Sequence, residues 1–337
     1  MPIPLEAGRV AGWKSIMIAP KPEPLVALGP FAAGADAILT SSVYYGEHNN
    51  SPYARQHRLG GSLLSVFVRK EVAKRLRAAQ RFLPEGYRLL VFDAYRPLQV
   101  QNSLFRFYRG QLQRQRPDMT EDELDAETQK YVSMPSSDPR RPSPHSTGGA
   151  VDLAIVRLPL EQSAALRRID HRLAKEHMSF DDRVALEMQK SAIARQHAEM
   201  LDFGTAFDHG GERAAIAYFE KRLASGVPLS PEEMEACDNR RLLHSVMTRA
   251  GMQAYEAEWW HFNAPESQMG AAAAGLAQAT YGAATFDARN SAHERLRRKL
   301  YDAAIASAAP DDPRTINRSW PTEVIGPQAA TSASARM

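Results

Sequence analysis

The sequence predicts an α+β fold with a small, mostly antiparallel central sheet flanked by helices. Two apolar runs of strand length, residues 87–92 and 150–156, are candidates for the sheet. Longer segments with apolar residues at every third or fourth position predict helices. The two kinds of segment are mixed along the chain without a regular β-α-β alternation, and this favours α+β over a parallel sheet.

The first part of the chain predicts a lead-in, a helix and a strand. Residues 1–40 are rich in Pro, Gly and Ala and predict an irregular lead-in, while the polar and aromatic residues 41–60 predict one lip of a cleft. Apolar residues spaced by three and four predict an amphipathic helix over 62–83. Pro84 and the glycine two residues later would end this helix before the strand over 87–92.

The middle of the chain is expected to be mostly helical. Pro97 suits the first turn of a helix that runs to about residue 108. Residues 111–144 are polar and contain several prolines, with one short helix expected over 120–132. Residues 159–200 are strongly helical and predict an inserted pair of helices, for which a lid, an oligomer contact and simple decoration all remain open.

The last part of the chain is expected to combine helices with two short strands. Ser179 with Asp182 predicts a helix N-cap, and Ser230 followed by Pro231 starts a helix that would end near Gly251. The other expected elements are a helix over 211–225, strands over 252–255 and 258–262, a helix over 286–307, and a final stretch of about 20 residues without fixed structure.

Composition and charge narrow the class of protein. The chain has 337 residues, of which 44% are hydrophobic and 24% charged, as is typical of a soluble globular protein. The formal net charge is +3, with basic and acidic residues intermixed, which gives no reason to expect a nucleic-acid partner. The single cysteine, Cys237, cannot form an internal disulfide, and its charged, helical context favours a packed thiol over a nucleophile.

The N-terminus and the lengths of the apolar runs indicate the cellular compartment in which we expect the protein. Residues 1–10 lack the basic start and the continuous apolar core of a signal peptide. No stretch reaches the ~18 strongly apolar residues of a membrane span. We therefore expect a cytoplasmic protein without a membrane partner, with the periplasm as the alternative.

One stretch of sequence, from Ser143 to Asp152, places an imidazole and a carboxylate seven residues apart. His145 is expected on a loop and Asp152 at the start of a buried strand, and the glycines between them let both side chains face one point. A neutral imidazole and a carboxylate are a ligand pair that suits zinc. An ordinary polar contact between a histidine and an aspartate is the alternative.

A second stretch, Glu258-Trp-Trp-His261, offers a third ligand in His261 and a carboxylate that need not touch the metal in Glu258. Three protein ligands with one position left for water are typical of catalytic zinc, whereas four ligands close a structural site. Residues three apart on a regular strand point to opposite faces, so the backbone must bend or bulge if both reach one centre. The alternative to a metal site is an ordinary core strand with Glu258 and His261 at its solvated end.

A third stretch, Asp93-Ala-Tyr95-Arg96-Pro97, follows the strand over 87–92. The guanidinium of Arg96 is always charged and carries forked donors, so it could stabilise an oxyanion. Arg96 could instead cap a carboxylate such as Asp93, which we expect to be structural. Tyr95 could pack in the core or line a pocket.

Together these three stretches resemble the zinc D-alanyl-D-alanine dipeptidases, the VanX-like branch of the D-Ala-D-Ala peptidases. The shared patterns are S-x-H-x-x-G-x-A-x-D, E-W-W-H and D-A-Y-R-P. Residues 202–208 are similar to the D-M-G-T-x-F-D segment of that family, and residues 239–251 to its helix before the E-W-W-H strand. The resemblance covers roughly residues 40–265.

The resemblance implies a D-Ala-D-Ala peptidase or Hedgehog-like zinc fold that binds one Zn²⁺ per chain. It implies hydrolysis of D-alanyl-D-alanine, or of a related short D-amino-acid dipeptide, by water that the metal activates. Asp208 would bind the ammonium group of the dipeptide. The roles implied for the residues are zinc ligation for His145, Asp152 and His261, proton transfer for Glu258, oxyanion stabilisation for Arg96, and substrate contact for Asp208, Ser143 and Tyr95.

Two departures from the family keep other functions open. Residues 41–60 lack the N-F-x-G segment of the family, and residues 159–200 take the place of a short connection, so the pocket could accept another dipeptide or a modified amide. A zinc carboxypeptidase or endopeptidase acting on cell-wall peptides, and a non-enzymatic zinc-stabilised binding protein, are the rivals.

We expect a lead-in over 1–40, a catalytic domain over 41–265, and an Ala/Gly-rich C-terminal extension over 266–337; a homo-oligomer is possible.

Overall fold

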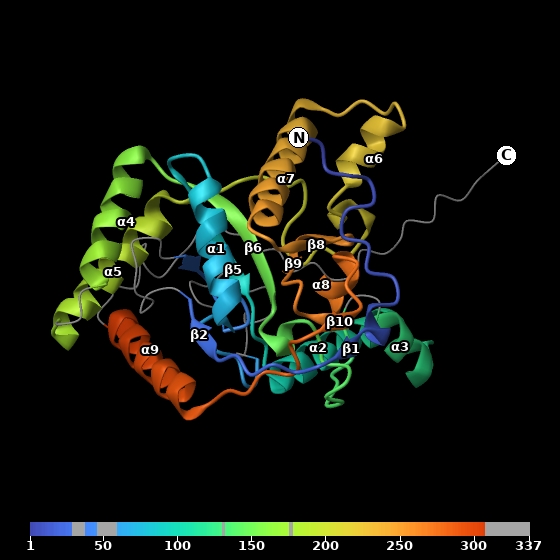
Figure 1. The fold of residues 1–337 in the computed structure, drawn as a ribbon, viewed down its shortest axis with the longest axis horizontal. Helices are drawn as coiled ribbons and strands as arrows, with labels where there is room; N and C mark the ends of the chain where they lie inside the picture. Colours follow the sequence, from blue (N-terminus) through green and yellow to red (C-terminus); the bar gives the residue numbers. More distant parts are fainter. Residues whose placement is uncertain (29–37, 46–58, 130–131, 175–177, 307–337) are drawn as a thin grey trace.

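A mixed sheet of six strands lies at the centre of the structure, a computed structural model that describes residues 1–28, 38–45, 59–129, 132–174 and 178–306 (Figure 1). The pair β3–β5 is parallel and the other pairs are antiparallel, which confirms the expected α+β fold with a mostly antiparallel sheet. The order is β3 (Leu39–Thr40), β5 (Tyr87–Asp93), β6 (Ala150–Arg157), β9 (Glu258–Asn263) and β8 (Gln253–Tyr255), with β7 (Glu199–Met200) paired to the end of β6.

Helices surround this sheet. Figure 1 shows α1 (Lys70–Phe82) in front of the sheet, with α4 (Leu160–Leu173) and α5 (Phe180–His197) packed together at one end of the molecule. The predicted pair of helices within 159–200 is therefore present. The other helices are α2 (Leu98–Gln115), α3 (Glu121–Thr128), α6 (Tyr218–Ala224), α7 (Pro231–Arg249), α8 (Gln268–Ala273) and α9 (Ala288–Ala306).

The two central strands, β5 and β6, form the middle of the hydrophobic core. Leu90 and Val91 on β5 are fully buried, as are Leu153 and Ala154 on β6. Because successive residues of a strand point to opposite faces, both faces of these strands must be covered. Strands that are buried on both faces read as continuous apolar runs, which is why the sequence located them correctly.

Helix α7 begins and ends where its local signals place it. The Ser230 side chain accepts a hydrogen bond from the Glu233 backbone N–H, and the Glu233 carboxylate accepts one from the Ser230 backbone N–H, which together form a capping box. Gly251 follows the helix with a φ of 84°, a conformation that glycine adopts without strain. The Ser179 side chain likewise accepts from the Asp182 backbone at the start of α5.

The predicted helix over 62–83 is wrong in its first part. Residues 62–66 are not helical, and β4 (Phe67–Arg69) precedes α1. Long-range contacts override the helical pattern here. The Glu294 carboxylate of α9 accepts hydrogen bonds from the backbone N–H groups of Leu64 and Ser65, at 2.8 and 2.9 Å, and β4 pairs with β2 (Leu25–Ala27). The pairing with β2 holds Phe67–Arg69 in an extended conformation, so a helix cannot run through these residues from residue 62.

Other boundaries also differ from the sequence expectations. Helix α2 continues to Gln115 rather than ending near residue 108, and the short helix expected over 120–132 covers Glu121–Thr128. The expected helix over 211–225 divides into a 3-10 turn over Glu212–Ala214 and helix α6. Residues 46–58 of the expected lip and residues 307–337 of the expected tail lie outside the described residues.

Both terminal segments pack onto the rest of the chain. The lead-in, expected to be irregular, contributes β1 (Met17–Ile18), β2 and β3. Strand β1 pairs in parallel with β10 (Gln278–Ala279), and α9 contacts β2 and α5. Of the helices in the described ranges, none is both long and apolar enough to cross a membrane.

Candidate active site

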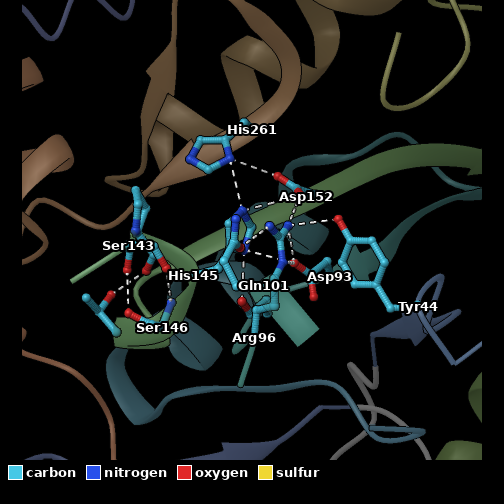
Figure 2. Close-up of polar contacts among 12 residues, drawn as sticks. Tyr44, Asp93, Arg96, Gln101, Ser143, His145, Ser146, Asp152 and His261 are labelled. Carbon is cyan, nitrogen blue, oxygen red and sulfur yellow. Dashed lines mark hydrogen bonds and ion pairs between the residues drawn. The ribbon is translucent and has the colours of Figure 1, made fainter. Parts of the chain in front are cut away.

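Three side chains from separate parts of the chain meet at the middle of the sheet. Figure 2 shows His145, Asp152 and His261 pointing toward one another. One ligand atom from each lies within 4.8 Å of the others, and all three residues are buried. Asp152 and His261 are paired neighbours on β6 and β9, and His145 comes from the 3-10 turn η3 (His145–Thr147) just before β6.

The turn that carries His145 depends on the glycine that follows it. Gly148 ends η3 with a φ of 68°, which reverses the chain into β6. A Cβ atom at this position would lie 2.5 Å from Cδ2 of Leu25, so a larger residue would also collide with β2. The sequence expectation that glycine brings His145 back over Asp152 is therefore confirmed.

Glu258 and His261 share one side of β9 because the strand is irregular between them. Ala254 on β8 pairs with Phe262, but the next residue, Tyr255, pairs with Glu258, so the register shifts at this point. The Nδ1 atom of His261 lies 3.7 Å from Oε2 of Glu258. This is the departure from a regular strand that the spacing of the two residues requires.

The nitrogens of the two imidazoles and the carboxylate oxygens of Asp152 lie at or slightly inside the separations expected around a small tetrahedral cation. His145 Nε2 is 3.3 Å from His261 Nδ1 and 3.3 Å from Asp152 Oδ2, and His261 Nδ1 is 2.9 Å from Asp152 Oδ1. Ligand atoms arranged tetrahedrally around zinc at about 2.0–2.2 Å stand about 3.3–3.6 Å apart. Two imidazole nitrogens with a carboxylate are also a donor set that zinc accepts.

The outer hydrogen bonds of the imidazoles suit tautomers in which the two convergent nitrogens carry no proton. His145 Nδ1 donates to the carbonyl oxygen of Ala94 at 2.9 Å, so that its Nε2 lone pair faces the centre. His261 Nε2 lies 3.2 Å from the side-chain oxygen of Asn263, and a proton on Nε2 would likewise leave the Nδ1 lone pair facing the centre. Partners of this kind orient metal-binding histidines and fix their tautomers.

Asp152 is held in its charged form. Burial alone would raise the pKa of this carboxyl, but contacts with His145 and His261 hold it well below its usual range. The centre therefore offers a carboxylate anion beside two imidazoles, which is a donor set that a divalent cation accepts.

Glu258 stands beside the three residues without being one of them. Its side chain remains 31% exposed. The pKa of Glu258 is raised to about 7 overall: its shielding from water and the negative charges of Asp152 and Asp208 raise it, while His261 and Arg96 lower it. A carboxyl group with such a pKa can both take and return a proton near neutral pH.

Arg96 is anchored by several protein groups. Its Nε donates to Asp93 at 2.9 Å, and its terminal nitrogens donate to Gln101 at 2.8 Å and to the Tyr44 hydroxyl at 2.9 Å. One terminal nitrogen is also 3.6 Å from Oδ2 of Asp152. The structural interpretation, in which Arg96 caps Asp93, is thus correct, and oxyanion stabilisation stays a prediction.

The three expected substrate-binding residues lie in different surroundings. Asp208 is close enough for its charge to act on both Glu258 and Arg96. The Ser143 hydroxyl accepts from the backbone N–H of Ser146 at 3.2 Å and thus caps the turn of His145. The ring of Tyr95 stacks on Phe286, with centroids 5.8 Å apart. Substrate contact stays a prediction for all three.

Sequence reasoning missed several residues that shape this centre. Asn263 lies two residues beyond His261 on the same strand, so strand periodicity could have revealed it. The ring of Tyr255 meets the ring of His261 edge-on at 5.6 Å. Tyr44 and Gln101 carried no signal, because only the folded chain brings them to Arg96.

Comparison with known proteins adds independent evidence. A family model described as D-ala-D-ala dipeptidase matches residues 40–167 and 174–279. A D-alanyl-D-alanine dipeptidase of Enterococcus faecium is 25% identical over 190 residues, which are 56% of this chain and 67% of that protein. One of Synechocystis is 26% identical over 208 residues, 58% of this chain and 68% of that protein. One of Escherichia coli is 32% identical over 72 residues, 21% of this chain and 32% of that protein.

Proposed function

Since the chain belongs to the D-Ala-D-Ala dipeptidase family, whose members are peptidases, we propose that it is a zinc-dependent dipeptidase. The observation that carries this proposal is the convergence of His145, Asp152 and His261, with Glu258 only 3.7 Å from one of them. In this proposal the expected domain over 41–265 is the catalytic unit.

The donor set and the orientation of the imidazoles support zinc as the cofactor. His145 would bind through Nε2, His261 through Nδ1 and Asp152 through its carboxylate. A bound zinc ion would supply Lewis-acid chemistry, polarising the peptide carbonyl and making water a better nucleophile at neutral pH.

Glu258 is the proposed proton carrier. The oxygen of a water molecule forms a bond to the carbonyl carbon of the substrate while Glu258 takes a proton from that water. The bond between carbon and nitrogen then breaks, and Glu258 returns the proton to the leaving amine. The position of the Glu258 carboxylate, with Oε2 3.7 Å from Nδ1 of His261, supports this role.

Arg96 and Asp208 would complete the site. Arg96 is a fixed positive charge near Asp152, so it would stabilise negative charge that develops on the carbonyl oxygen. Asp208 lies near both Arg96 and Glu258 and would pair with the free ammonium group of the substrate. A carboxylate at that place would restrict hydrolysis to very short peptides.

The relatives, by their names, act on D-alanyl-D-alanine, and we propose this dipeptide or a related short D-amino-acid dipeptide as the substrate. The test is a panel of alanyl-alanine dipeptides in the D,D, L,D, D,L and L,L forms, assayed with and without a chelator. We expect hydrolysis of the D,D form that the chelator abolishes and added zinc restores. Hydrolysis of a longer wall peptide instead of any dipeptide would favour the carboxypeptidase or endopeptidase alternative.

A further inference from the structure

The turn that carries His145 is held from outside by one buried arginine. Arg69 is the last residue of β4 and is only 6% exposed. Its backbone N–H donates to the carbonyl of Gly148 at 2.9 Å, and its side-chain Nε donates to the carbonyl of Thr147 at 2.7 Å. A single residue thus binds two successive carbonyls of the segment that follows His145.

The other two nitrogens of the Arg69 guanidinium reach both terminal segments of the chain. One donates to the carbonyl of Glu23 in the N-terminal segment, and the other to the carbonyl of Gly282 in the C-terminal segment at 2.9 Å. The guanidinium carbon also lies 5.1 Å from the centre of the Tyr281 ring. Residues 23 and 282 both lie outside the range that the family model matches, so this support belongs to the additional segments of this chain.

The same two terminal segments contact one another and the turn directly. The Glu23 carboxylate accepts a hydrogen bond from the Tyr281 hydroxyl at 3.0 Å. The backbone N–H of Ala284 donates to the carbonyl of Ser146 at 2.8 Å. Leu25 packs so closely on Gly148 that a Cβ atom there would collide with it. The turn is therefore enclosed by both terminal segments, with Arg69 between them.

We propose that Arg69 is a positioning residue for His145, and that through it the two terminal segments set the affinity of the site for zinc. The proposal rests on the zinc site of the proposed function. Its physical basis is that Nε2 of His145 can meet a metal only while the backbone of its turn keeps its position. Without the guanidinium, the carbonyls of Thr147, Glu23 and Gly282 lose their donors, and unpaired buried carbonyls favour a loosened turn.

Lysine cannot replace Arg69 in this arrangement. The planar guanidinium presents donors in fixed directions and here serves three carbonyls of three separate segments. An ammonium group is a single point at the end of a flexible stem, so it would reach at most one or two of them. Arg69→Lys therefore keeps the positive charge and removes the fixed directions of the hydrogen-bond donors.

Arg240 offers a matched control. It is also buried, at 1% exposure, and its guanidinium donates to three backbone carbonyls, those of Phe203, Ala215 and Arg213, at 2.8, 2.7 and 2.9 Å. None of these carbonyls belongs to the turn of His145. Arg240→Lys should therefore lower thermal stability in the same way without acting on that turn.

The experiment measures the zinc dissociation constant of the full chain by competition with a chromophoric chelator, together with the melting temperature of each metal-free variant. We expect Arg69→Lys to weaken zinc binding by about 10- to 100-fold, as is usual for the loss of groups that orient metal ligands, and Arg240→Lys to leave it within about twofold of the wild type. At saturating zinc, Arg69→Lys should regain the kcat of the wild type.

Wild-type zinc affinity in a folded Arg69→Lys variant would overturn the inference, while failure of the wild-type chain to bind zinc would overturn the proposed function. Tyr281→Phe serves if Arg69→Lys does not fold, because it removes only the hydroxyl that holds Glu23. It should weaken zinc binding by about threefold. An unchanged dissociation constant in Tyr281→Phe would then count against the inference.

Discussion

The Nδ1 atom of His261 lies 2.9 Å from Oδ1 of Asp152, across the neighbouring strands β6 and β9. The two residues are directly paired in the register of the sheet, so their approach is set by backbone hydrogen bonds of the core. Sites built on strands hold their geometry more closely than sites built on loops. His145, which comes from a turn, is the proposed ligand whose position needs separate support.

Replacing Glu258 tests the proton carrier. Glu258→Gln keeps the size of the side chain but cannot accept the proton, so we expect kcat to fall by at least about 100-fold. Zinc content should stay that of the wild type, because Glu258 is not one of the three convergent residues. Glu256→Gln, two residues away and exposed, is the control and should retain activity. Full activity in Glu258→Gln would remove this residue from the mechanism.

Replacing a proposed metal ligand tests whether zinc is the cofactor. His145→Ala removes one of three donors, so the zinc content measured by mass spectrometry should fall from about one per chain to near zero. Zinc should also raise the melting temperature of the wild type and not that of this variant, because a ligand stabilises only the state that binds it. His171→Ala, an exposed histidine of α4, should bind zinc normally. Equal zinc content in both variants would contradict the assignment.

Replacing Asp208 tests recognition of the substrate ammonium group. Asp208 has a φ of 62°, a conformation that asparagine also tolerates, so Asp208→Asn changes the charge with little strain. We expect kcat/KM for a free dipeptide to fall by about 10-fold or more, as for the loss of a charged hydrogen bond. The wild type should discriminate against the N-acetylated dipeptide and Asp208→Asn should discriminate less. Equal discrimination in both would exclude this role.

Glu187 lies outside the candidate site, and its raised pKa predicts that the stability of the protein depends on pH. Burial raises its pKa from 4.5 to about 7, against the opposing charges of Lys190, Arg297 and Arg183, while Asp170 raises it further. A carboxyl whose pKa is raised by folding contributes its full stability at pH values below its ordinary pKa of 4.5. This contribution is lost as the pH rises through about 7. The wild type should therefore lose stability between pH 5 and pH 8 relative to Glu187→Gln, by up to about 3 kcal/mol.

Denaturant unfolding of metal-free protein at both pH values measures this difference. Glu85→Gln is the control, because the side chain of Glu85 is 63% exposed in its ion pair with Arg167. The control should follow the wild type at both pH values. A free energy difference between the wild type and Glu187→Gln that does not change with pH would show that Glu187 ionises in the folded chain as freely as in the unfolded one.

Local signals in the sequence predicted those parts of the fold that local contacts decide. Helix α7 begins at a capping box and ends before a glycine, and both signals lie within a few residues of the boundary. The start of α1 was misplaced because Phe67–Arg69 pairs with Leu25–Ala27 of β2, a partner far from it along the chain. Such a partner leaves no trace in the periodicity of the segment it captures.

The candidate site likewise contains residues that the sequence could identify and groups that it could not. His145, Asp152, Glu258 and His261 could be picked out because their spacing carries the chemistry. The groups that orient them, such as the carbonyl of Ala94, have no characteristic residue type and appear only in the folded chain. For Arg96, the sequence suggested both a cap for Asp93 and a catalytic charge; the contact with Asp93 is present, and the catalytic role awaits the kinetics of variants.

Anomalous X-ray scattering at the zinc absorption edge, from a crystal of the full chain grown with zinc, tests the central claim most directly. The account predicts one peak per chain, bounded by Nε2 of His145, Nδ1 of His261 and the carboxylate of Asp152. The absence of a peak among these three groups, with or without zinc bound elsewhere on the chain, would contradict it.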